Sequence, residues 1–429
     1  MRLIYSLLIY CLLPVLFGYF FWRSLREPDY RRGWLQRLGF VPRTEQPSIW
    51  LHVASVGETQ AALPLIERLI ERYPDHRIVV TSFTPTGSAL VSARLGERVS
   101  NVYLPVDTPC AVARFLRRLR PRIGVIVETE LWPNLLLGCK ARAIPMVLAS
   151  ATLSEKSARR YLRSPMRGLM SAALQAFHIV TVQSAPDAER FGSLGVRQGR
   201  IELSGNLKFD LSVDESLPGQ AATLRHNWQA GGRAVWLAAS THEGEEEQVI
   251  ATFRQLQTRH PNQLLILVPR HLQRFDSVAG IMEKSGLNFV RRSQGETVDS
   301  DTEVVLVDSL GELMLFYAMA DVAFVAGSLT PIGGHNLLEP AALAKPIVTG
   351  PYCESQQQLL DLLAARDAVV QVDTQEELAT TIAQLLEDGN RRKEMGQAAQ
   401  AVVTENRGAL SRIEGAVARS MLHSARPTS

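Results

Sequence analysis

The stretch HVASVGETQAALPL, residues 52–65, joins an apolar run of β-strand character to a run with helical spacing, through Ser55-Val-Gly-Glu58. A strand that leads directly into a helix is the repeating unit of an α/β sheet. Ser55 and Glu58 stand three residues apart, which is the spacing of a capping box, so the plainest interpretation of Glu58 is a helix cap. It is also a candidate reagent, because ligands of such sheets bind beyond the carboxyl ends of the strands.

The same alternation of strand and helix continues along both halves of the chain. The first half contains SIWLHVA, HRIVVTS, NVYLPV, IGVIVE, IPMVLAS and HIVTVQ; the second contains AVWLAAS, QLLILVP, EVVLVD, DVAFVAG, KPIVTG and AVVQV. Continuous apolar strands separated by helical segments predict parallel sheets covered on both faces. The sequence therefore predicts an α/β fold with two doubly wound, Rossmann-like domains and a cleft between them.

The domain boundaries follow from composition. Residues 1–22 predict a membrane-anchor helix, and residues 23–210 the first α/β domain. Residues 211–232 are polar and broken by Pro218 and a Gly-Gly pair, so they predict a linker. Residues 233–429 then form the second domain, whose last helices are able to pack back on the first.

The N-terminal segment is charge-free from Leu3 to Trp22 and long enough to cross a bilayer, which takes about 20 apolar residues. One arginine precedes it and five follow, so the positive-inside rule predicts a body on the cytoplasmic side and disfavours a cleaved signal peptide. Pro14 leaves a second interpretation open, a helix that lies in the membrane interface. Arg31, Arg32 and Arg37 are expected at anionic headgroups or acceptor phosphates.

Several protein classes are excluded or disfavoured. A net charge of +3 over 429 residues is too small to indicate nucleic acid as a partner, and four widely separated cysteines predict neither a disulfide framework nor a zinc site. Walker and dinucleotide fingerprints are absent. Asp299-Ser-Asp301 is read as a solvated loop and His242-Glu243 as the start of a helix capped by Ser240, so we predict no metal and no cofactor.

The candidate chemistry lies at the strand ends and differs between the halves. The first half offers acids, Glu58 and Glu128, with Glu130 a weaker candidate. The second half offers Arg270-His271 after a strand and a glycine-rich run, residues 327–339. Backbone N–H groups of such a turn bind phosphate, although Asn336 and Glu339 also have the spacing of a simple helix cap.

These segments together resemble one family. SVGET, TPTG, ETELWPN, GNLKFD, STHEGEE, LVPRH, GELM and GGHNLLEP, in this order behind an apolar anchor, are similar to the Kdo transferases. The resemblance implies a GT-B fold and transfer of 3-deoxy-D-manno-octulosonic acid (Kdo) from CMP-Kdo to a lipid A precursor, lipid IVA, in lipopolysaccharide core synthesis. It also implies a place on the cytoplasmic face of the bacterial inner membrane, in contact with its lipids.

The resemblance assigns roles to residues. Glu58 is implied as the catalytic base of an inverting transfer and Glu128 as a second important acid, with Lys208 and Ser240 as possible helpers. The implied CMP-binding residues are Pro269, Arg270, His271, Leu310, Gly311, Glu312, Gly333, Gly334, His335, Asn336, Leu337, Leu338 and Glu339. Two departures from the family pattern, Gln36-Arg37 and Ala326-Gly-Ser328, lie outside this set.

Two other functions stay open at this point. One is a GT-B enzyme that uses a UDP-sugar on a lipid or cell-wall acceptor, and the other is a membrane-tethered scaffold without turnover. For Glu58 itself, a helix N-terminus should lower the pKa and desolvation should raise it, and the sequence does not decide between them.

Overall fold

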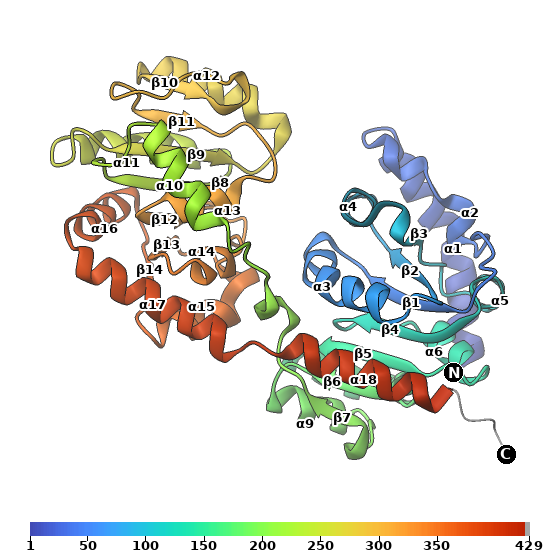
Figure 1. Ribbon diagram of the computed structural model, residues 1–429. Coiled ribbons are helices and arrows are strands. Elements are labelled where there is room, and N and C mark those ends of the chain that lie inside the picture. Colours follow the sequence, from blue (N-terminus) through green and yellow to red (C-terminus); the bar gives the residue numbers. More distant parts are fainter. Residues whose placement is uncertain (425–429) are drawn as a thin grey trace. The chain divides into compact units, whose positions relative to one another are not determined.

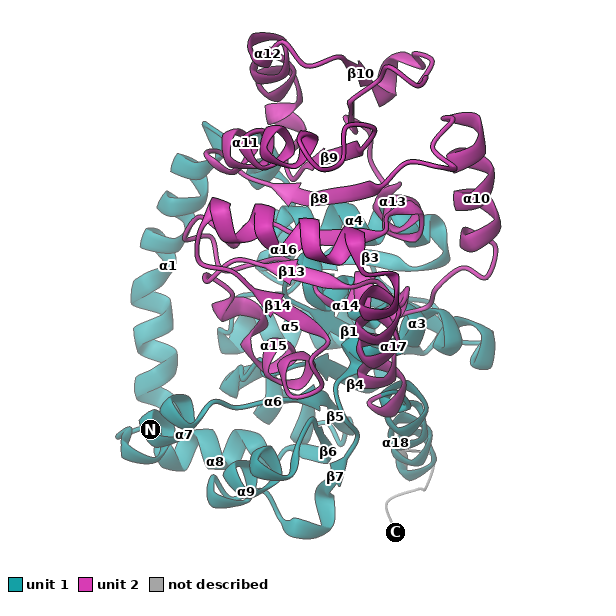
Figure 2. Cartoon of the chain, turned by 90° about the vertical axis from the view of Figure 1, so that its left-hand side faces the viewer, with its two compact units in different colours: residues 1–210, 407–429 teal, residues 211–406 magenta. Residues whose placement is uncertain are grey.

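The computed structural model describes residues 1–424 and divides the chain into two compact units (Figure 2). Unit 1 consists of residues 1–210 together with the segment from residue 407 onward, and unit 2 of residues 211–406. Each unit has a seven-stranded sheet with helices around it (Figure 1).

The sheet of unit 1 has the strand order β3-β2-β1-β4-β5-β6-β7, with all strands parallel. The direction in which the chain adds strands reverses between β1 and β4. Loops that follow neighbouring strands at such a reversal run apart and leave a crevice for ligands. The strands are β1 (Ser48–Val53), β2 (Arg77–Ser82), β3 (Ser100–Tyr103), β4 (Pro121–Val127), β5 (Met146–Ala151), β6 (Phe177–Val182) and β7 (Ile201–Leu203).

Helices cover both faces of this sheet, as the uninterrupted apolar strands predict. In β1, Trp50 faces one core and Ile49 and Leu51 face the other, and all three are fully buried. The Trp50 core is completed by α5 (Pro109–Leu119), α6 (Pro133–Lys140), α7 (Glu155–Arg163), α8 (Arg167–Leu174) and α9 (Ala185–Ser193). The Ile49 core is completed by α3 (Val56–Arg72), α4 (Pro85–Leu95) and α18 (Ala409–Ser424).

The C-terminal helix α18 therefore belongs to unit 1. Ile413 is fully buried in the Ile49 core, and the helix packs on β4, β5 and β6. The carboxylate of Asp210 accepts the backbone N–H groups of Gly408 (2.8 Å) and Leu410 (2.7 Å), which holds the start of this helix beside the end of the first domain.

Unit 2 repeats the architecture with the strand order β10-β11-β9-β8-β12-β13-β14, and the order reverses between β8 and β12. Its strands are β8 (Val235–Thr241), β9 (Leu264–Pro269), β10 (Phe289–Arg291), β11 (Val304–Leu306), β12 (Val322–Val325), β13 (Ile347–Thr349) and β14 (Val369–Gln371). Its helices are α10 (Leu217–Asn227), α11 (Glu245–Gln257), α12 (Phe275–Ser285), α13 (Leu313–Met319), α14 (Leu338–Ala342), α15 (Gln357–Ala364), α16 (Gln375–Glu387) and α17 (Gly389–Glu405).

The segment expected as a linker contains a helix. In α10, Ala221 is buried, and Trp228 directly after the helix stacks on Phe316 of α13 with 5.9 Å between ring centroids. The polar composition of residues 211–232 hid this contact, because two buried side chains are enough to fix the segment onto unit 2.

Helix α1 (Arg2–Ser24) is long and apolar enough to cross a membrane by length and composition. It nevertheless packs on unit 1 at both ends. Near its start the Tyr5 hydroxyl donates to the Asp107 carboxylate (2.9 Å), and near its end the Phe20 side chain is only 3% exposed. Between these contacts it presents an outward apolar face that includes Leu7, Leu8 and Val15.

We expect Ile413→Ala to lower the free energy of unfolding of unit 1 by about 2–5 kcal/mol, because it leaves a cavity under the sheet. Urea unfolding followed by fluorescence measures this change. The control is Leu422→Ala in the same helix, where the side chain is 71% exposed and the change should stay within about 0.5 kcal/mol. Equal effects of the two substitutions would contradict the placement of α18 in the core.

Candidate functional site

Glu58 lies in the first turn of α3, directly beyond the carboxyl end of β1. Its carboxylate turns back on the strand end: Oε2 accepts the backbone N–H of Ala54 (2.7 Å), and Oε1 accepts the hydroxyl of Ser55 (3.0 Å). Ser55 in turn accepts the backbone N–H of Glu58. The Ser55 half of the predicted capping box is present, but the Glu58 carboxylate accepts the N–H of Ala54 rather than that of Ser55, so Glu58 takes part in the cap through the end of the strand.

Glu128 follows the last residue of β4, the strand next to β1. Its φ of 58° is in the left-handed region, which a non-glycine residue rarely adopts and which ends the strand there. Lys208 Nζ lies 2.8 Å from Glu128 Oε1. The lysine is brought there by a short 3-10 turn, η4 (Leu207–Asp210), and the hydroxyl of Ser150 accepts the backbone N–H of Leu207.

Glu130 is a third acid at the same edge. Trp132 donates its indole N–H to Glu130 Oε2 (2.8 Å), and Phe83 stacks on Trp132 at 6.1 Å. Burial raises the pKa of Glu130, and the charge of Glu58 raises it further. Three carboxylates and one lysine therefore interact at the strand-order reversal of unit 1.

Burial also raises the pKa of Glu58 above its ordinary value. The Ala54 N–H, the Ser55 hydroxyl and Lys208 oppose this rise, and the Glu128 carboxylate adds to it. Desolvation is the largest of these contributions, and together with the Glu128 charge it outweighs the two hydrogen bonds and the lysine charge that lower the pKa. A carboxylate with a raised pKa is a stronger base, which suits proton abstraction near neutral pH.

The three arginines predicted near the membrane differ. Arg31 and Arg32 are exposed and line two separate hollows of about 500 and 400 Å³ beside Gln36. Arg37 is only 3% exposed: its guanidinium lies under the rings of Phe20, Phe83 and Tyr103, at 4.4–5.3 Å, and donates to the carbonyl of Phe83. In this arrangement Arg37 presents no surface to a phosphate, which is a correction to its predicted role.

In unit 2, Pro269 ends β9 and Arg270 follows with an exposed side chain. The backbone N–H of Arg270 donates to the carbonyl of Thr241 at the end of β8 (3.0 Å), which ties the two strand ends together. His271 lies edge-on to His242, with 5.1 Å between ring centroids. Burial lowers the pKa of His271, and Arg270 and Arg274 lower it further.

The glycine-rich run after β12 reaches the same edge. Nε2 of His335 lies 2.8 Å from Nε2 of His242, and the rings are nearly parallel. Gly327 must be glycine, because its φ is +70° and a Cβ there would lie 2.6 Å from the His335 ring. Burial, followed by Arg270 and the two other histidines, lowers the pKa of His335 to about 4. At neutral pH it is therefore an uncharged hydrogen-bonding group.

The remaining predicted donor residues occupy two places. Asn336 accepts the backbone N–H of Leu338 on its side-chain oxygen (3.0 Å), but α14 begins at Leu338 after Leu337 with no side-chain cap, so the predicted helix cap by Asn336 is not what the structure shows. Gly333 and Gly334 precede Asn336 with positive φ angles, and Leu337, Leu338 and Glu339 follow it at the start of α14. Leu310, Gly311 and Glu312 lie before α13, with Leu310 exposed. Burial alone would raise the pKa of Glu312, but hydrogen bonds from Arg292 and Ser309 hold it below its usual range.

Ser240, a predicted helper and cap, has a φ of 62° and is nearly buried at the end of β8, but α11 begins after Gly244 with no side-chain cap. The sequence interpretation missed two neighbours, Glu245 and Glu246, both fully buried. Helical spacing gave a signal, because they precede the buried Val249 and Ile250 by four residues each and so share their face.

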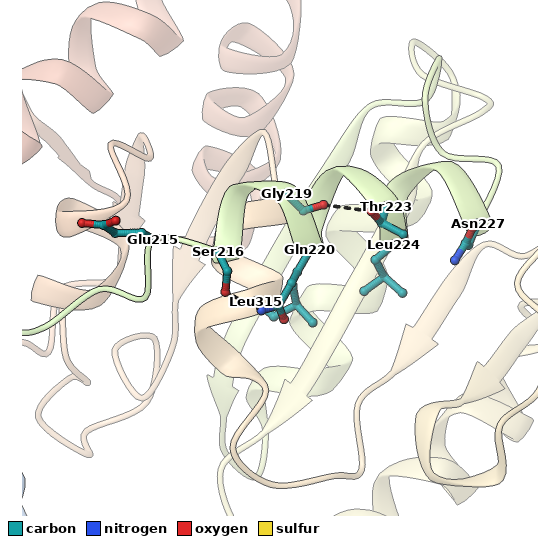
Figure 3. Close-up of a pocket in the computed structure, with 8 residues that line it drawn as sticks. All are labelled: Glu215, Ser216, Gly219, Gln220, Thr223, Leu224, Asn227 and Leu315. Atoms are coloured by element: carbon teal, nitrogen blue, oxygen red, sulfur yellow. Dashed lines mark hydrogen bonds between the residues drawn. The ribbon is translucent and has the colours of Figure 1, made fainter.

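Neither a metal-binding cluster nor the cavity between α10 and α13 lies at the strand-end residues described above. Among residues 1–424 there is no group of three His, Cys, Asp or Glu side chains able to hold a metal ion. A cavity of about 610 Å³ lies between α10 and α13, where Gln220 and Leu224 point toward Leu315 and Glu215 lies apart (Figure 3). No predicted donor residue lines this cavity, although all of them are described, and we assign it no role in catalysis.

Comparison with family models gives two matches. A model described as 3-Deoxy-D-manno-octulosonic-acid transferase (kdotransferase) matches residues 32–211, and one described as glycosyl transferases group 1 matches residues 239–402. A 3-deoxy-D-manno-octulosonic acid transferase from Haemophilus influenzae is 38% identical over 96% of this chain and 97% of its own length. The Bordetella pertussis protein of the same name is 37% identical, with 85% of each covered.

A solved structure shares the fold. The putative UDP-N-acetylglucosamine 2-epimerase from Listeria monocytogenes is 14% identical and aligns over 90% of this chain and 99% of its own, with a TM-score of 0.55. Together with the glycosyl transferase model that matches residues 239–402, this confirms the predicted GT-B fold. That fold has two α/β domains that follow one another along the chain, each with its own parallel sheet.

We expect the pKa of Glu58 to respond to its two charged neighbours in opposite directions. Glu128→Gln should lower it, because a negative charge is removed, and Lys208→Met should raise it. Carboxyl ¹³C NMR titration, with Glu58→Gln used to assign the signal, measures both shifts. Lys140→Met replaces an exposed lysine of unit 1 and should leave the signal unchanged. Shifts of the same sign in both test variants would contradict the geometry.

Proposed function

The chain belongs to the Kdo transferases, glycosyltransferases of lipopolysaccharide synthesis, and we propose that it moves Kdo from CMP-Kdo to a sugar hydroxyl of lipid IVA with Glu58 as general base. The observation that carries this proposal is the raised pKa of a carboxylate held beyond the end of β1, beside Glu128 and Lys208.

The reaction is one in-line displacement. The acceptor oxygen forms a bond to the anomeric carbon of Kdo while the bond from that carbon to the CMP phosphate oxygen breaks, and CMP leaves with the electron pair. The proton of the acceptor hydroxyl passes to Glu58. A single displacement of this kind inverts the anomeric configuration.

Glu58 is able to accept that proton although it caps its helix. Each carboxylate oxygen accepts one hydrogen bond, Oε2 from the Ala54 N–H and Oε1 from the Ser55 hydroxyl, and each has a second lone pair that can take up a proton. Lys208 forms an ion pair with Glu128 and offsets its negative charge. When Glu58 takes up the proton, the acid beside it is therefore already paired with a cation.

Unit 2 supplies the groups suited to the leaving CMP. Arg270 is exposed at the end of β9, and His335 and the positive-φ glycines stand at the end of β12, the strand next to β8. Arginine and backbone N–H groups stabilise the negative charge that develops on a phosphate. No step of this scheme passes through a metal ion.

We expect Glu58→Gln to reduce transfer at least about 100-fold and to leave CMP affinity within about twofold, since a general base contributes 10²–10⁴-fold. Incubation with CMP-Kdo and tetra-acylated lipid A precursor, followed by mass analysis of the product, measures transfer. The control is Glu67→Gln, an exposed acid in the same helix. Near-normal transfer by Glu58→Gln would remove its role as base, and competition by UDP but not CMP would favour the UDP-sugar alternative.

We further propose that α1 is an interfacial anchor on the cytoplasmic face of the inner membrane. A helix of 23 residues is about 34 Å long, and contacts at Tyr5 and Phe20 bind both ends to the same globular unit. One end therefore cannot cross a bilayer while the other stays. The outward apolar face suits insertion into one leaflet, with Arg31 and Arg32 near anionic headgroups or the acceptor phosphates.

This placement predicts that the N-terminus stays on the cytoplasmic side. A cleavable tag before Met1 should be removed by protease added to inside-out membrane vesicles and protected in right-side-out vesicles. The opposite pattern would show a spanning helix. An internal tag in the exposed segment 293–297 of unit 2 is the control, because it belongs to the body in either case.

A further inference from the structure

Two adjacent carboxylates at the start of α11, Glu245 and Glu246, are fully buried and have no place in the reaction scheme. Buried charges are rare because desolvation is costly, and they persist where hydrogen bonds or a partner charge compensate them. The two glutamates are compensated by different groups. Most of the groups that bind Glu245 lie in one loop of unit 2, and the group that binds Glu246 lies in another.

Glu245 is satisfied by backbone alone. Its Oε2 accepts the N–H groups of His242 (2.9 Å) and Gly327 (2.8 Å), and its Oε1 accepts those of Ser328 (2.9 Å) and Leu329 (3.0 Å). Three consecutive amides after β12 thus close on a carboxylate of the chain itself. This fixes the beginning of the glycine-rich run that leads to His335.

The hydrogen bonds of Glu245 also determine which backbone N–H groups of the glycine-rich run remain free to bind an anion. The amides of Gly327, Ser328 and Leu329 form the kind of concave turn that binds phosphate, but Glu245 already occupies it. A donor phosphate must therefore be met further along, at the Gly333–Asn336 end of the run.

Glu246 is satisfied by an ion pair. Arg274 binds it with both terminal nitrogens, Nη1 to Oε1 at 2.6 Å and Nη2 to Oε2 at 3.1 Å. The backbone N–H of Arg274 donates to the carbonyl of His271 (2.9 Å), so the pair fixes the short turn that follows Arg270. A planar guanidinium in bidentate contact sets orientation as well as distance.

His242, in the same β8–α11 turn, connects the two loops directly. Its ring hydrogen-bonds His335 on one side and meets the His271 ring on the other. His242, Glu245 and Glu246 thereby contact the two segments that carry the proposed phosphate-binding groups, although the two glutamates are buried rather than at the open edge.

We propose that Glu245 and Glu246 are positioning residues of the donor site: Glu245 sets the glycine-rich run and Glu246, through Arg274, sets the Arg270 segment, so that both bind one nucleoside monophosphate. This inference rests on the proposed function, because it presumes that these two loops hold CMP. Their negative charges do not repel the phosphate, because four N–H dipoles and one guanidinium neutralise them.

The test is calorimetric titration of the full-length protein in detergent with CMP, below the unfolding temperature of every variant. Glu245→Gln, Glu246→Gln and Arg274→Gln should each weaken CMP binding at least tenfold. The double variant Glu246→Gln/Arg274→Gln should regain part of the loss, because it leaves no unpaired buried charge. Glu247→Gln, an exposed glutamate of the same turn, should bind CMP like the wild type.

Kinetics separate positioning from simple destabilisation. Positioning raises the KM for CMP-Kdo and changes kcat little at saturating donor, whereas partial unfolding lowers the binding stoichiometry and kcat at unchanged KM. Folded variants with wild-type CMP affinity and donor KM would overturn the inference alone. Absence of CMP binding by the wild-type protein would overturn the donor-site proposal and this inference with it.

Discussion

The arrangement of this protein depends on one constraint: all strands of a parallel sheet end at the same edge, and only where strand order reverses do adjacent loops run apart. In unit 1 that point lies between β1 and β4, and in unit 2 between β8 and β12. Glu58 and Glu128 follow the first pair of strands, and His242 and His335 follow the second. Glu58 and Glu128 are 70 positions apart along the chain, and His242 and His335 are 93 apart. Each pair is brought together by the strand order, and no motif in the sequence links its two members.

The two units use a glutamate in the first helical turn after the central strand in related ways. Glu58 accepts the N–H of Ala54, and Glu245 accepts the N–H of His242, so each carboxylate closes the strand-to-helix turn. The difference is what else they accept. Glu245 is saturated by four N–H groups and fully buried, and protonating it would break that set. Glu58 accepts one N–H and one hydroxyl, so it has capacity left for a proton, which is why only it suits the role of base.

Much of this could be predicted from sequence because it is local. Apolar strand runs gave the sheets, S-x-x-E spacing gave the Glu58 cap, and strand-end positions gave Arg270. What the sequence left undecided, or predicted wrongly, depends on which groups surround a residue in space. The pKa of Glu58 is raised because burial outweighs the hydrogen bonds from Ala54 and Ser55 and the charge of Lys208. Arg37 is buried because Phe20 of α1 packs over its guanidinium, and the polar segment forms α10 because Trp228 stacks on Phe316. Periodicity could have revealed Glu245 and Glu246, whose spacing from Val249 and Ile250 places them on the buried face.

Arg37 shows how the anchor and the acid-bearing edge belong to one packed body. A buried guanidinium with aromatic faces around it is stabilised by cation–π attraction, which holds only while the rings stay in place. One ring is Phe20 of α1; another is Phe83, which stacks on Trp132, the donor to Glu130. Removing α1 would therefore expose the cation and loosen Phe83. The helix is thus part of the structure that supports the acid-bearing edge, and the membrane role proposed for it cannot be separated from that packing.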